Sequence, residues 1–373
     1  AAPQTYRSRN FIVHSDIDRE QAEDLLKRLE RMLDIISKYW GRPNRKPIEC
    51  CVVKDLGEWP AGRIPPMAIQ KLKKRTGVTL SVSRRQGMMF STKSIVYAPA
   101  DVSITQHEAV HAIAAQSFGS TGPVWYSEGM AEMGRYWENE DDRAVRCERT
   151  VISYLRRSPL PSLKTLTRTG VTADSWQNYA QRWALCHLLA NNDNYATRFR
   201  VIGPQLMNLK PQTSFRRAFG TMSREIEFEY HEFLRHLQRG YRVDLCVWDW
   251  KARFRRGRSG RTTKVTVAAD RGWQASRLIV EAGKSYSVRA SGNWKLSSDA
   301  RPINADGDSS GEGRLEAVIF SQFRLTASAK LGATATFTPS QGGKLFLRCG
   351  DRWNALHDNS GKIKVSLTLL PSK

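Results

Sequence analysis

The stretch Gln106-His107-Glu108-Ala109-Val110-His111 decides how the first half of this chain folds. In a helix, side chains four positions apart lie on the same face, one turn from each other. The imidazoles of His107 and His111 therefore reach toward one point, where they can hold a single metal ion. Glu108 projects beside this face, where it can take a proton from a water molecule at the metal. The residues that follow are mostly alanine, with valine and isoleucine, which is typical of a buried helix.

A second helix supplies the ligand that two histidines leave missing, since catalytic zinc generally has three protein ligands and one open position. The sequence Gly122-Pro123-Val124-Trp125-Tyr126-Ser127-Glu128-Gly129-Met130-Ala131-Glu132 is a turn followed by a proline suited to a first helical turn. Glu128 stands 17 positions after His111, which leaves room for one helix to end and a second to return antiparallel. Glu132 lies one turn further along the same face, where it can accept a hydrogen bond from a ligand histidine.

These two motifs resemble those of the gluzincin zinc metallopeptidases, the peptidase MA group that includes thermolysin-like enzymes and aminopeptidase N. The resemblance implies that zinc is bound by His107, His111 and Glu128, and that Glu108 is the general base and acid. It also implies a zincin-like α+β fold for residues 1–250, with the site between a sheet and a helical half. The implied activity is hydrolysis of a protein or peptide substrate. The alternative reading of the first motif is a buried helix whose histidines only form hydrogen bonds.

A tetrahedral intermediate in peptide hydrolysis needs a hydrogen-bond donor for its negatively charged oxygen. In the gluzincin family a downstream tyrosine or histidine has this role, and the candidate in this sequence is Tyr179. It lies in a predicted helix over residues 174–185, with Trp176, Ala180 and Trp183 on the same face. Two interpretations stay open for Tyr179: an oxyanion donor, or a core aromatic of this helix.

The rest of the first 250 residues shows an α+β pattern. Hydrophobic periodicity and end signals predict a strand at 10–14, a helix at 17–40, strands at 48–53 and 90–97, and a last helix at 223–239. Residues 56–88, rich in proline and lysine, are predicted to be a long loop.

Composition narrows the class of protein. The 373-residue chain is 40% hydrophobic and 25% charged, as expected of a folded soluble protein, and it has no apolar run of membrane-spanning length. Its six cysteines include no Cys-x-x-Cys pair, which argues against a thiolate-bound zinc. The chain begins Ala-Ala-Pro, which fits a trimmed N-terminus. We therefore expect an exported protein, secreted or periplasmic, with one or more disulfides.

The net charge of +23 is spread along the chain rather than gathered in a nucleic-acid-binding motif. Seven basic residues and no acidic residue lie from Lys251 to Lys264, where the pattern changes from helix to strand. We predict that residues 251–263 form an exposed basic linker. No nucleic-acid fold motif accompanies the charge, so nucleic acid is not the expected partner. Acidic polysaccharide, an anionic cell surface or an acidic substrate are partners that such charge also attracts.

From residue 264 onward, apolar and polar residues alternate in short runs that are separated by Gly, Asn and Asp turns. This pattern predicts an all-β sandwich over residues 264–373. Two segments, Val288-Arg-Ala-Ser-Gly-Asn-Trp294 and Leu347-Arg-Cys-Gly-Asp351 with the nearby Asp358-Asn-Ser-Gly361, resemble the galactophilic bacterial lectin.

In that lectin, the matching loop holds a calcium ion that takes part in sugar binding. The resemblance implies that calcium would be bound by Asp351, Asp358 and Asn359, whose oxygen atoms are the kind of ligand that calcium takes. The sugar-contacting loop of the lectin has no good match in this sequence. The alternative is an Asx-rich turn between two strands without a metal.

The sequence thus predicts an α+β zincin-like metallopeptidase domain over residues 1–250, a linker over 251–263 and an all-β sandwich over 264–373. The predicted function is zinc-dependent hydrolysis of peptide bonds, with calcium as a candidate second metal. The competing hypothesis is a catalytically weak or inactive zincin-fold protein that binds carbohydrate or a surface through its sandwich.

Overall fold

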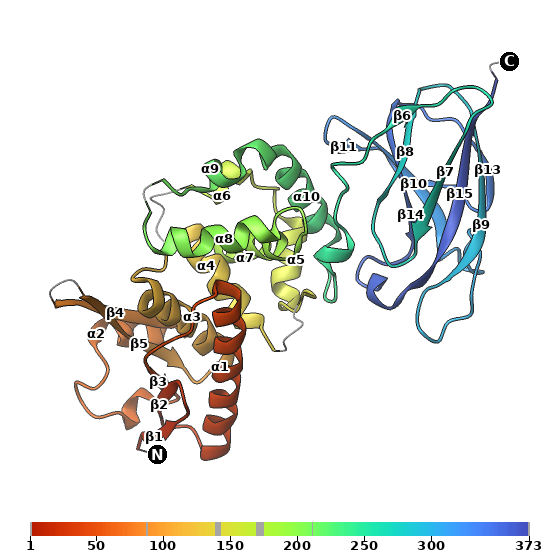
Figure 1. Ribbon diagram of the computed structural model, residues 1–373. Coiled ribbons are helices and arrows are strands. Elements are labelled where there is room, and N and C mark those ends of the chain that lie inside the picture. Colours follow the sequence, from red (N-terminus) through yellow and green to blue (C-terminus); the bar gives the residue numbers. More distant parts are fainter. Residues whose placement is uncertain (1, 87–88, 139–142, 169–174, 211, 372–373) are drawn as a thin grey trace. The chain divides into compact units, whose positions relative to one another are not determined.

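The computed structural model describes residues 2–86, 89–138, 143–168, 175–210 and 212–371. The chain is mixed α/β and divides into two compact units (Figure 1). The first unit comprises Ala1–Asp142, Ser158–Asn191 and Tyr195–Gly220, and the second comprises Arg143–Arg157, Asn192–Asn194 and Thr221–Lys373. Each unit is built from three separate segments of the sequence, whereas each predicted domain is one continuous segment. The limits of the predicted domains stay a prediction.

A five-stranded sheet is the base of the first unit, with strand order β1-β2-β3-β5-β4. Its strands are β1 (Gln4–Arg7), β2 (Phe11–Ser15), β3 (Ile48–Val53), β4 (Val78–Gln86) and β5 (Met89–Pro99). The three central strands are parallel to one another, and the two edge strands, β1 and β4, are antiparallel to their neighbours. The predicted strands at 10–14, 48–53 and 90–97 are confirmed as β2, β3 and β5.

The helices of the first unit are α1 (Arg19–Trp40), α2 (Pro66–Lys73), α3 (Val102–Phe118), α4 (Val124–Tyr136), α6 (Leu163–Leu166), α7 (Trp176–Asn191), α8 (Ala196–Met207) and α9 (Phe215–Phe219). The predicted helix at 17–40 is confirmed as α1, which starts two residues later because the Asp18 side chain accepts a hydrogen bond from the backbone of Gln21 as its N-cap. Asp101 caps α3 in the same way, through the backbone N–H of Ile104.

The stretch 56–88 is not the long loop that its composition predicts. It contains α2 and all of β4, while residues 87–88 lie outside the described residues. Pro66 occupies the first turn of α2, where proline lacks only an N–H that the helix does not use. Strand β4 pairs along its whole length with β5. The loop prediction was wrong at α2 because its proline marks the start of a helix and its lysines lie at an exposed helix end. It was wrong at β4 because this edge strand contains many polar residues.

Helix α4 packs at close range against two neighbouring helices, in both cases at a glycine. A Cβ atom on Gly129 would lie 2.3 Å from Cys186 Sγ and 2.8 Å from the carbonyl oxygen of Arg182, both on α7. A Cβ atom on Gly134 would lie 2.4 Å from a methyl carbon of Val110 on α3. Since side chains do not tolerate such distances, a larger residue at either position would force the helices apart.

Tyr126 ties α4 to two further helices. Its hydroxyl oxygen accepts a hydrogen bond from Trp40 Nε1 of α1 at 2.9 Å. A Cβ atom on Gly203 of α8 would lie 2.1 Å from the same oxygen. The fully buried ring of Tyr126 also packs against Phe199, with ring centroids 5.5 Å apart. Helix α4 is therefore the element on which the helical half of the first unit is assembled.

All six cysteines are free thiols, so the predicted disulfides are wrong and export of the protein stays a prediction. Cys50 and Cys51 are buried neighbours in β3. Burial raises the pKa of Cys51 to about 11, which keeps its thiol protonated. No helix within the described residues is long and apolar enough to cross a membrane.

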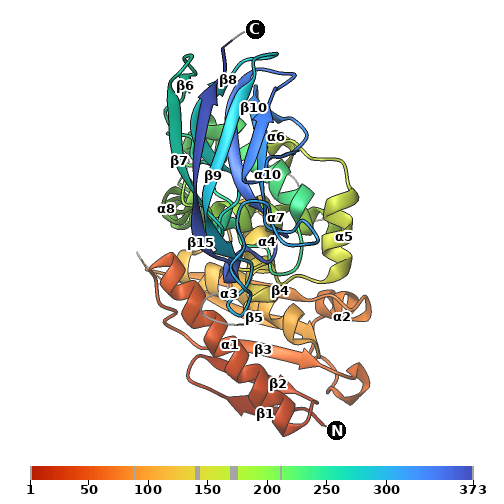
Figure 2. The same ribbon diagram turned by 90° about the vertical axis from the view of Figure 1, so that its right-hand side faces the viewer.

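The second unit contains two sheets that fit a β-sandwich (Figure 2). One has the order β11-β10-β14-β8-β6, with β12 beside β10, and the other has the order β13-β9-β15-β7. The strands are β6 (Arg255–Arg256), β7 (Thr262–Ala268), β8 (Gln274–Val280), β9 (Tyr286–Lys295), β10 (Arg314–Ser321), β11 (Arg324–Leu325), β12 (Ala329–Lys330), β13 (Thr334–Phe337), β14 (Gly343–Gly350) and β15 (Ser360–Leu369). The core between the sheets includes Trp294, Leu345 and Val365.

Two helices, α5 (Arg149–Arg157) and α10 (Ser223–His236), also belong to the second unit. Phe228 of α10 packs against Trp248 and Phe320, with ring centroids 4.9 Å and 5.2 Å apart, and these rings form an aromatic cluster with sandwich residues. The predicted helix at 223–239 is confirmed as α10. Within the predicted linker 251–263, the two residues of β6 pair in parallel with β8, and residues 262–263 begin β7, which pairs with β15.

Replacing Gly129 by alanine tests the close packing of α4. Gly129→Ala should lower the free energy of unfolding by about 1–3 kcal/mol, because the new methyl group meets the backbone of α7. The matched control is Gly220→Ala: Gly220 has a helical φ of −54° and no heavy atom nearer than 3.8 Å to the added Cβ. This control should stabilise the protein by about 0.4–1 kcal/mol. Urea unfolding of both variants measures the difference, and equal effects would contradict the packing argument.

Candidate metal centre

Three side chains from α3 and α4 bring ligand atoms to one point. His107 Nε2 lies 3.2 Å from His111 Nε2. The Oε2 atom of Glu128 lies 3.4 Å from His107 Nε2 and 3.5 Å from His111 Nε2. His107 and Glu128 are nearly buried, at 8% and 9% exposure. The helical spacing and the second-helix position predicted from the sequence therefore place these three residues together.

The triangle of ligand atoms has the size that a zinc ion requires. Zinc bonds to histidine nitrogen and carboxylate oxygen are about 2.0–2.2 Å long, so tetrahedral ligands stand roughly 3.3–3.6 Å apart. The three observed separations, from 3.2 to 3.5 Å, agree with this. Among the described residues, His107, His111 and Glu128 are the one group of three or more His, Cys, Asp or Glu side chains with this convergence.

The second nitrogen of each histidine lies close to an oxygen atom of α4. His111 Nδ1 is within hydrogen-bond distance of Ser127 Oγ, at 3.1 Å, and such a partner holds Nε2 toward the site. His107 Nδ1 lies 3.0 Å from Glu132 Oε1, within ion-pair distance but without the geometry of a hydrogen bond. Glu132 stands where the sequence predicts it. Ser127 has no predicted role, although its place directly before Glu128 on the same helix was a usable signal.

The histidines and the carboxylates of this site shift one another's pKa values. Burial alone would lower the pKa of His107, but the carboxylates of Glu128 and Glu132 raise it to about 10. Burial alone would raise the pKa of Glu128, yet the two histidines hold it well below its usual range. Without a metal ion, the site therefore keeps a proton on His107 at neutral pH.

Glu108, the predicted general base, is held by the edge strand β4. Thr79 Oγ1 lies 2.9 Å from Glu108 Oε2, to which it can donate a hydrogen bond, and 2.7 Å from the backbone oxygen of the same residue. A Cβ atom on Gly77 would lie 2.5 Å from Glu108 Cγ, so the chain before β4 approaches this side chain closely. Because β4 was predicted as loop, neither Thr79 nor Gly77 was expected near the site.

Tyr179 of α7 lies beside the histidines. Its ring centroid is 6.0 Å from that of His107, with the two ring planes tilted by 31°. The residue is partly exposed, unlike the fully enclosed Ala184 further along α7. This position suits an oxyanion donor, and the assignment stays a prediction.

The candidate calcium ligands differ in their environment. Asp351 and Asn359 are buried, and among the described residues Asp351 Oδ2 and Asn359 Oδ1 have no hydrogen-bond partner. Asp358 is exposed, in the short helix η4 (Leu356–Asp358). Two buried oxygens without a partner fit a bound cation. The alternative turn also has support, since Asp351 Oδ1 accepts a hydrogen bond from the backbone of Arg352.

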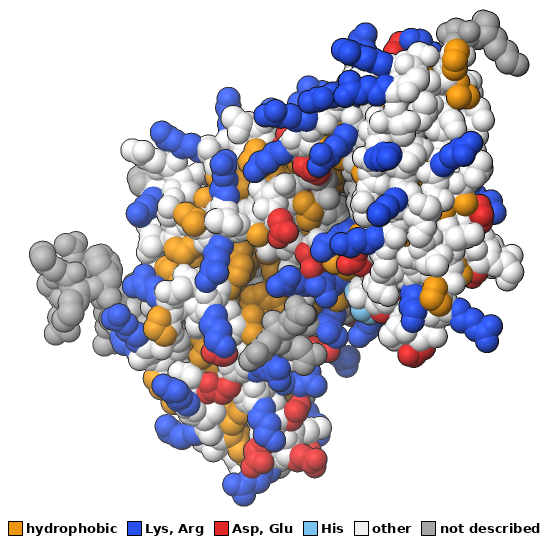
Figure 3. Space-filling model, turned by 45° about the vertical axis from the view of Figure 1, so that its right-hand side comes forward, with side chains coloured by type: hydrophobic (Ala, Val, Ile, Leu, Met, Phe, Trp, Pro, Cys, Tyr) orange, Lys and Arg blue, Asp and Glu red, His pale blue; other side chains and the backbone are white. Residues whose placement is uncertain are grey.

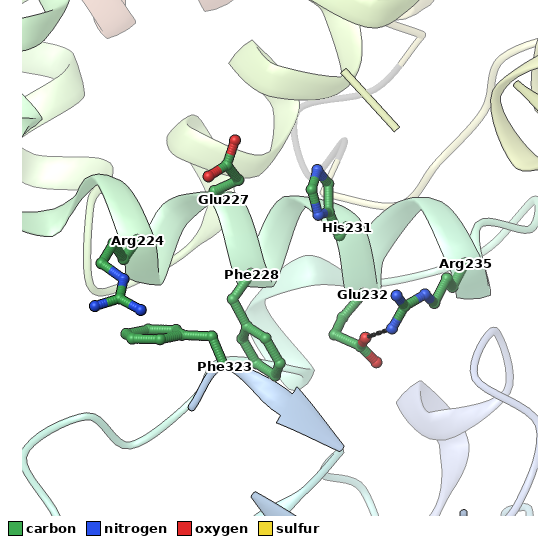
Figure 4. A pocket seen from close by; sticks show the side chains of 7 residues that line it. All are labelled: Arg224, Glu227, Phe228, His231, Glu232, Arg235 and Phe323. Carbon is green, nitrogen blue, oxygen red and sulfur yellow. Dashed lines mark hydrogen bonds and ion pairs between the residues drawn. The ribbon is translucent and has the colours of Figure 1, made fainter. Parts of the chain in front are cut away.

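A small hollow beside α10 has no assignment. Its volume is about 230 Å³, and side chains of α10 and the ring of Phe323 line it (Figure 4). Arg235 forms an ion pair with Glu232, and the Arg224 guanidinium lies 4.6 Å from the centre of the Phe323 ring. Both arginines therefore already interact with other side chains that line the hollow, Glu232 and Phe323.

Comparison with known proteins gives only weak likenesses. No protein-family model and no curated protein matches the sequence. A solved structure described as "EclA N-terminal domain; PllA-like lectin" is 17% identical with a TM-score of 0.24, over 28% of this chain and 94% of that one. A metallopeptidase, IMPa from Pseudomonas aeruginosa, is 14% identical with a TM-score of 0.19. The match covers 52% of this chain and 20% of the IMPa chain. Both TM-scores are too low to support a conclusion about this chain.

Proposed function

We propose that this protein is a zinc-dependent peptidase whose metal is held by His107, His111 and Glu128. The observation that carries the proposal is the match between the triangle of their ligand atoms and the spacing of tetrahedral zinc ligands. A zinc ion bound there supplies a Lewis acid that polarises a carbonyl group and makes a water molecule more acidic.

The protein side chains divide the remaining work of hydrolysis. Glu108 accepts a proton from the attacking water and delivers it to the leaving amine, as a general base and then a general acid. Thr79 holds the Glu108 carboxylate in place, and burial of Glu108 keeps competing water away. Tyr179 stands near His107, where its hydroxyl can donate to the developing oxyanion.

The substrate in this proposal is an extended peptide. Strand β4 is an edge of the sheet, so one side of its backbone is free of a strand partner within the described residues. An edge strand can pair with an added peptide strand through backbone hydrogen bonds. Because Thr79 of β4 contacts Glu108, a peptide on this edge runs past the general base.

A second candidate function is calcium-dependent carbohydrate binding by the sandwich, with hydrolysis weak or lost. The two partnerless oxygens of Asp351 and Asn359 favour it. Calcium-dependent glycan binding by a chain that hydrolyses no peptide would decide for this candidate.

Replacing the general base separates metal binding from catalysis. Glu108→Gln should retain about one zinc per chain and lose at least about a hundredfold in turnover, because the amide cannot accept the proton. His111→Ala should lose both zinc and activity. Mass spectrometry of the metal and hydrolysis of a peptide library measure the two effects. The control is Glu20→Gln, on the exposed first turn of α1. Undiminished hydrolysis by Glu108→Gln would sink the mechanism.

Zinc uptake should release a proton. The pKa of His107 is about 10 in the metal-free site, so at pH 7 its ring carries a proton that zinc must displace. Titration calorimetry at pH 7, in buffers of different ionisation enthalpy, should give a slope of about one proton released per zinc bound. A binding enthalpy that does not depend on the buffer would contradict this protonation state.

Gly77→Ala tests whether β4 positions the general base. The added methyl group displaces the Glu108 side chain, so kcat should fall by about tenfold or more, as expected of a misplaced catalytic group. Zinc content should stay close to that of the parent, since the three atoms nearest to the added methyl group all belong to Glu108 and none to a metal ligand. The control is again Gly220→Ala. An unchanged kcat would show that Glu108 does not depend on β4.

A further inference from the structure

The outer face of the sheet β13-β9-β15-β7 has an unusual composition. None of these four strands contains Asp or Glu. Their outward side chains are serine, threonine and asparagine, with one alanine, and the exposed cations among them include Lys264, Arg289, Lys362 and Lys364. The aromatic residues of these strands point into the sandwich core. Figure 3 shows this part of the second unit as a mostly white surface with separate blue side chains.

A groove of about 700 Å³ lies along one side of this face. Three cations line it: Lys264 from β7, Lys364 from β15 and Arg277 from β8. Strand register puts Lys364 directly opposite Thr266 and Ser291, which also line the groove. Asp249 is the one acidic residue among the lining side chains. The groove thus combines an excess of positive charge with hydroxyl groups at neighbouring positions.

The three cations have no counter-charge of their own. Within the part of the chain that the structure describes, no carboxylate lies within ion-pair distance of Lys264, Arg277 or Lys364. Like charges repel, so three cations that line one groove without a paired carboxylate raise one another's electrostatic energy. A bound anion would relieve this repulsion.

Arg277 is presented by a strained backbone. Its φ is 64°, in the left-handed region that is unfavourable for a residue with a Cβ atom. It lies in β8 where the register with β14 shifts, as in a β-bulge. Bulges redirect a side chain, and backbone strain of this kind is found more often at ligand-binding and active sites than elsewhere. The bulge thus turns the guanidinium toward the groove that the two lysines line.

We propose that this groove binds an anionic polysaccharide, a linear sugar chain that carries carboxylate or sulfate groups. Neighbouring strands are about 5 Å apart and outward side chains on one strand about 7 Å apart, which sets the spacing of Lys264 and Lys364 on the paired strands β7 and β15. Arg277 lines the same groove from β8 of the other sheet. Hydroxyl and amide side chains between them match the hydroxyls of sugars. Single-stranded nucleic acid binds through stacking on exposed aromatic rings as well as through charge. Trp273 is the one aromatic residue among the lining residues, and it is buried, with its ring against Trp353 and the Arg348 guanidinium.

Charge removal tests the proposal. Lys264→Gln/Lys364→Gln should weaken binding to heparin, a sulfated probe, or to polygalacturonate, a carboxylated probe, by about tenfold, and should make the salt dependence shallower. The matched control, Lys71→Gln/Lys73→Gln on the exposed face of α2, removes the same charge and should change affinity less than about twofold. Which probe binds tells sulfate from carboxylate recognition. Equal losses in both variants, or no binding to either probe, would overturn the proposal. Stronger binding to a DNA oligonucleotide, lost in the groove variant, would assign the groove to nucleic acid instead.

A second variant tests the strained residue. Arg277→Gly removes the guanidinium and leaves a residue that adopts a φ of 64° without strain. We expect the melting temperature to be unchanged or higher while polysaccharide affinity falls about fivefold or more, as for the loss of one charged contact. Unaltered affinity would show that Arg277 does not contact the ligand. Binding should persist in Glu108→Gln, so failure of the zinc site and failure of this groove are separate results.

Discussion

The structure of the candidate metal centre depends on how closely α3, α4 and α7 approach one another. The ligands come from two helices, so their atoms converge only if α4 lies near enough to α3. Gly134 permits that approach, and Gly129, the residue after Glu128, permits the same on the α7 side. The glycine in the second motif is therefore a packing requirement, and the glutamate beside it is placed by the contact that the glycine allows. Tyr126 then fixes α4 against α1 and α8.

Much of this site could be predicted from the sequence because its signals are local. The spacing of His107 and His111 within one helix places both side chains on the same face of that helix. Because the helix is largely buried, these side chains have few alternative positions. Glu128 and Glu132 follow the same rule on a second helix. Thr79 could not be predicted in this way, because its role depends on how the edge strand β4 pairs with β5 and approaches Glu108 of α3. The free cysteines show a similar limit, since composition alone does not fix a disulfide.

The positive charge of the chain also shows the difference between what a local stretch of sequence indicates and what only the fold brings together. The charge run at residues 251–264 contains one of the groove cations, Lys264, whereas Arg277 and Lys364 lie outside it, on two other strands of the second unit. The pairing of β7 with β15 brings Lys364 close to Lys264, although the two are 364 − 264 = 100 positions apart in the sequence, and Arg277 lines the groove from the other sheet. A bulge with an unfavourable φ at Arg277 has no sequence signal, since arginine is not a residue that marks such a position.

The contacts of Thr79 have a consequence for the proton that Glu108 carries. The Thr79 hydroxyl has a single hydrogen, and two acceptors of Glu108, a carboxylate oxygen and the backbone oxygen, are both in reach. When the carboxylate is charged, that hydrogen is best directed to it. Once Glu108 is protonated, rotation about one C–O bond turns the hydrogen to the backbone oxygen and leaves a lone pair of the hydroxyl to accept from the carboxylic acid. A rotor of this kind can satisfy both charge states of the residue without moving the backbone.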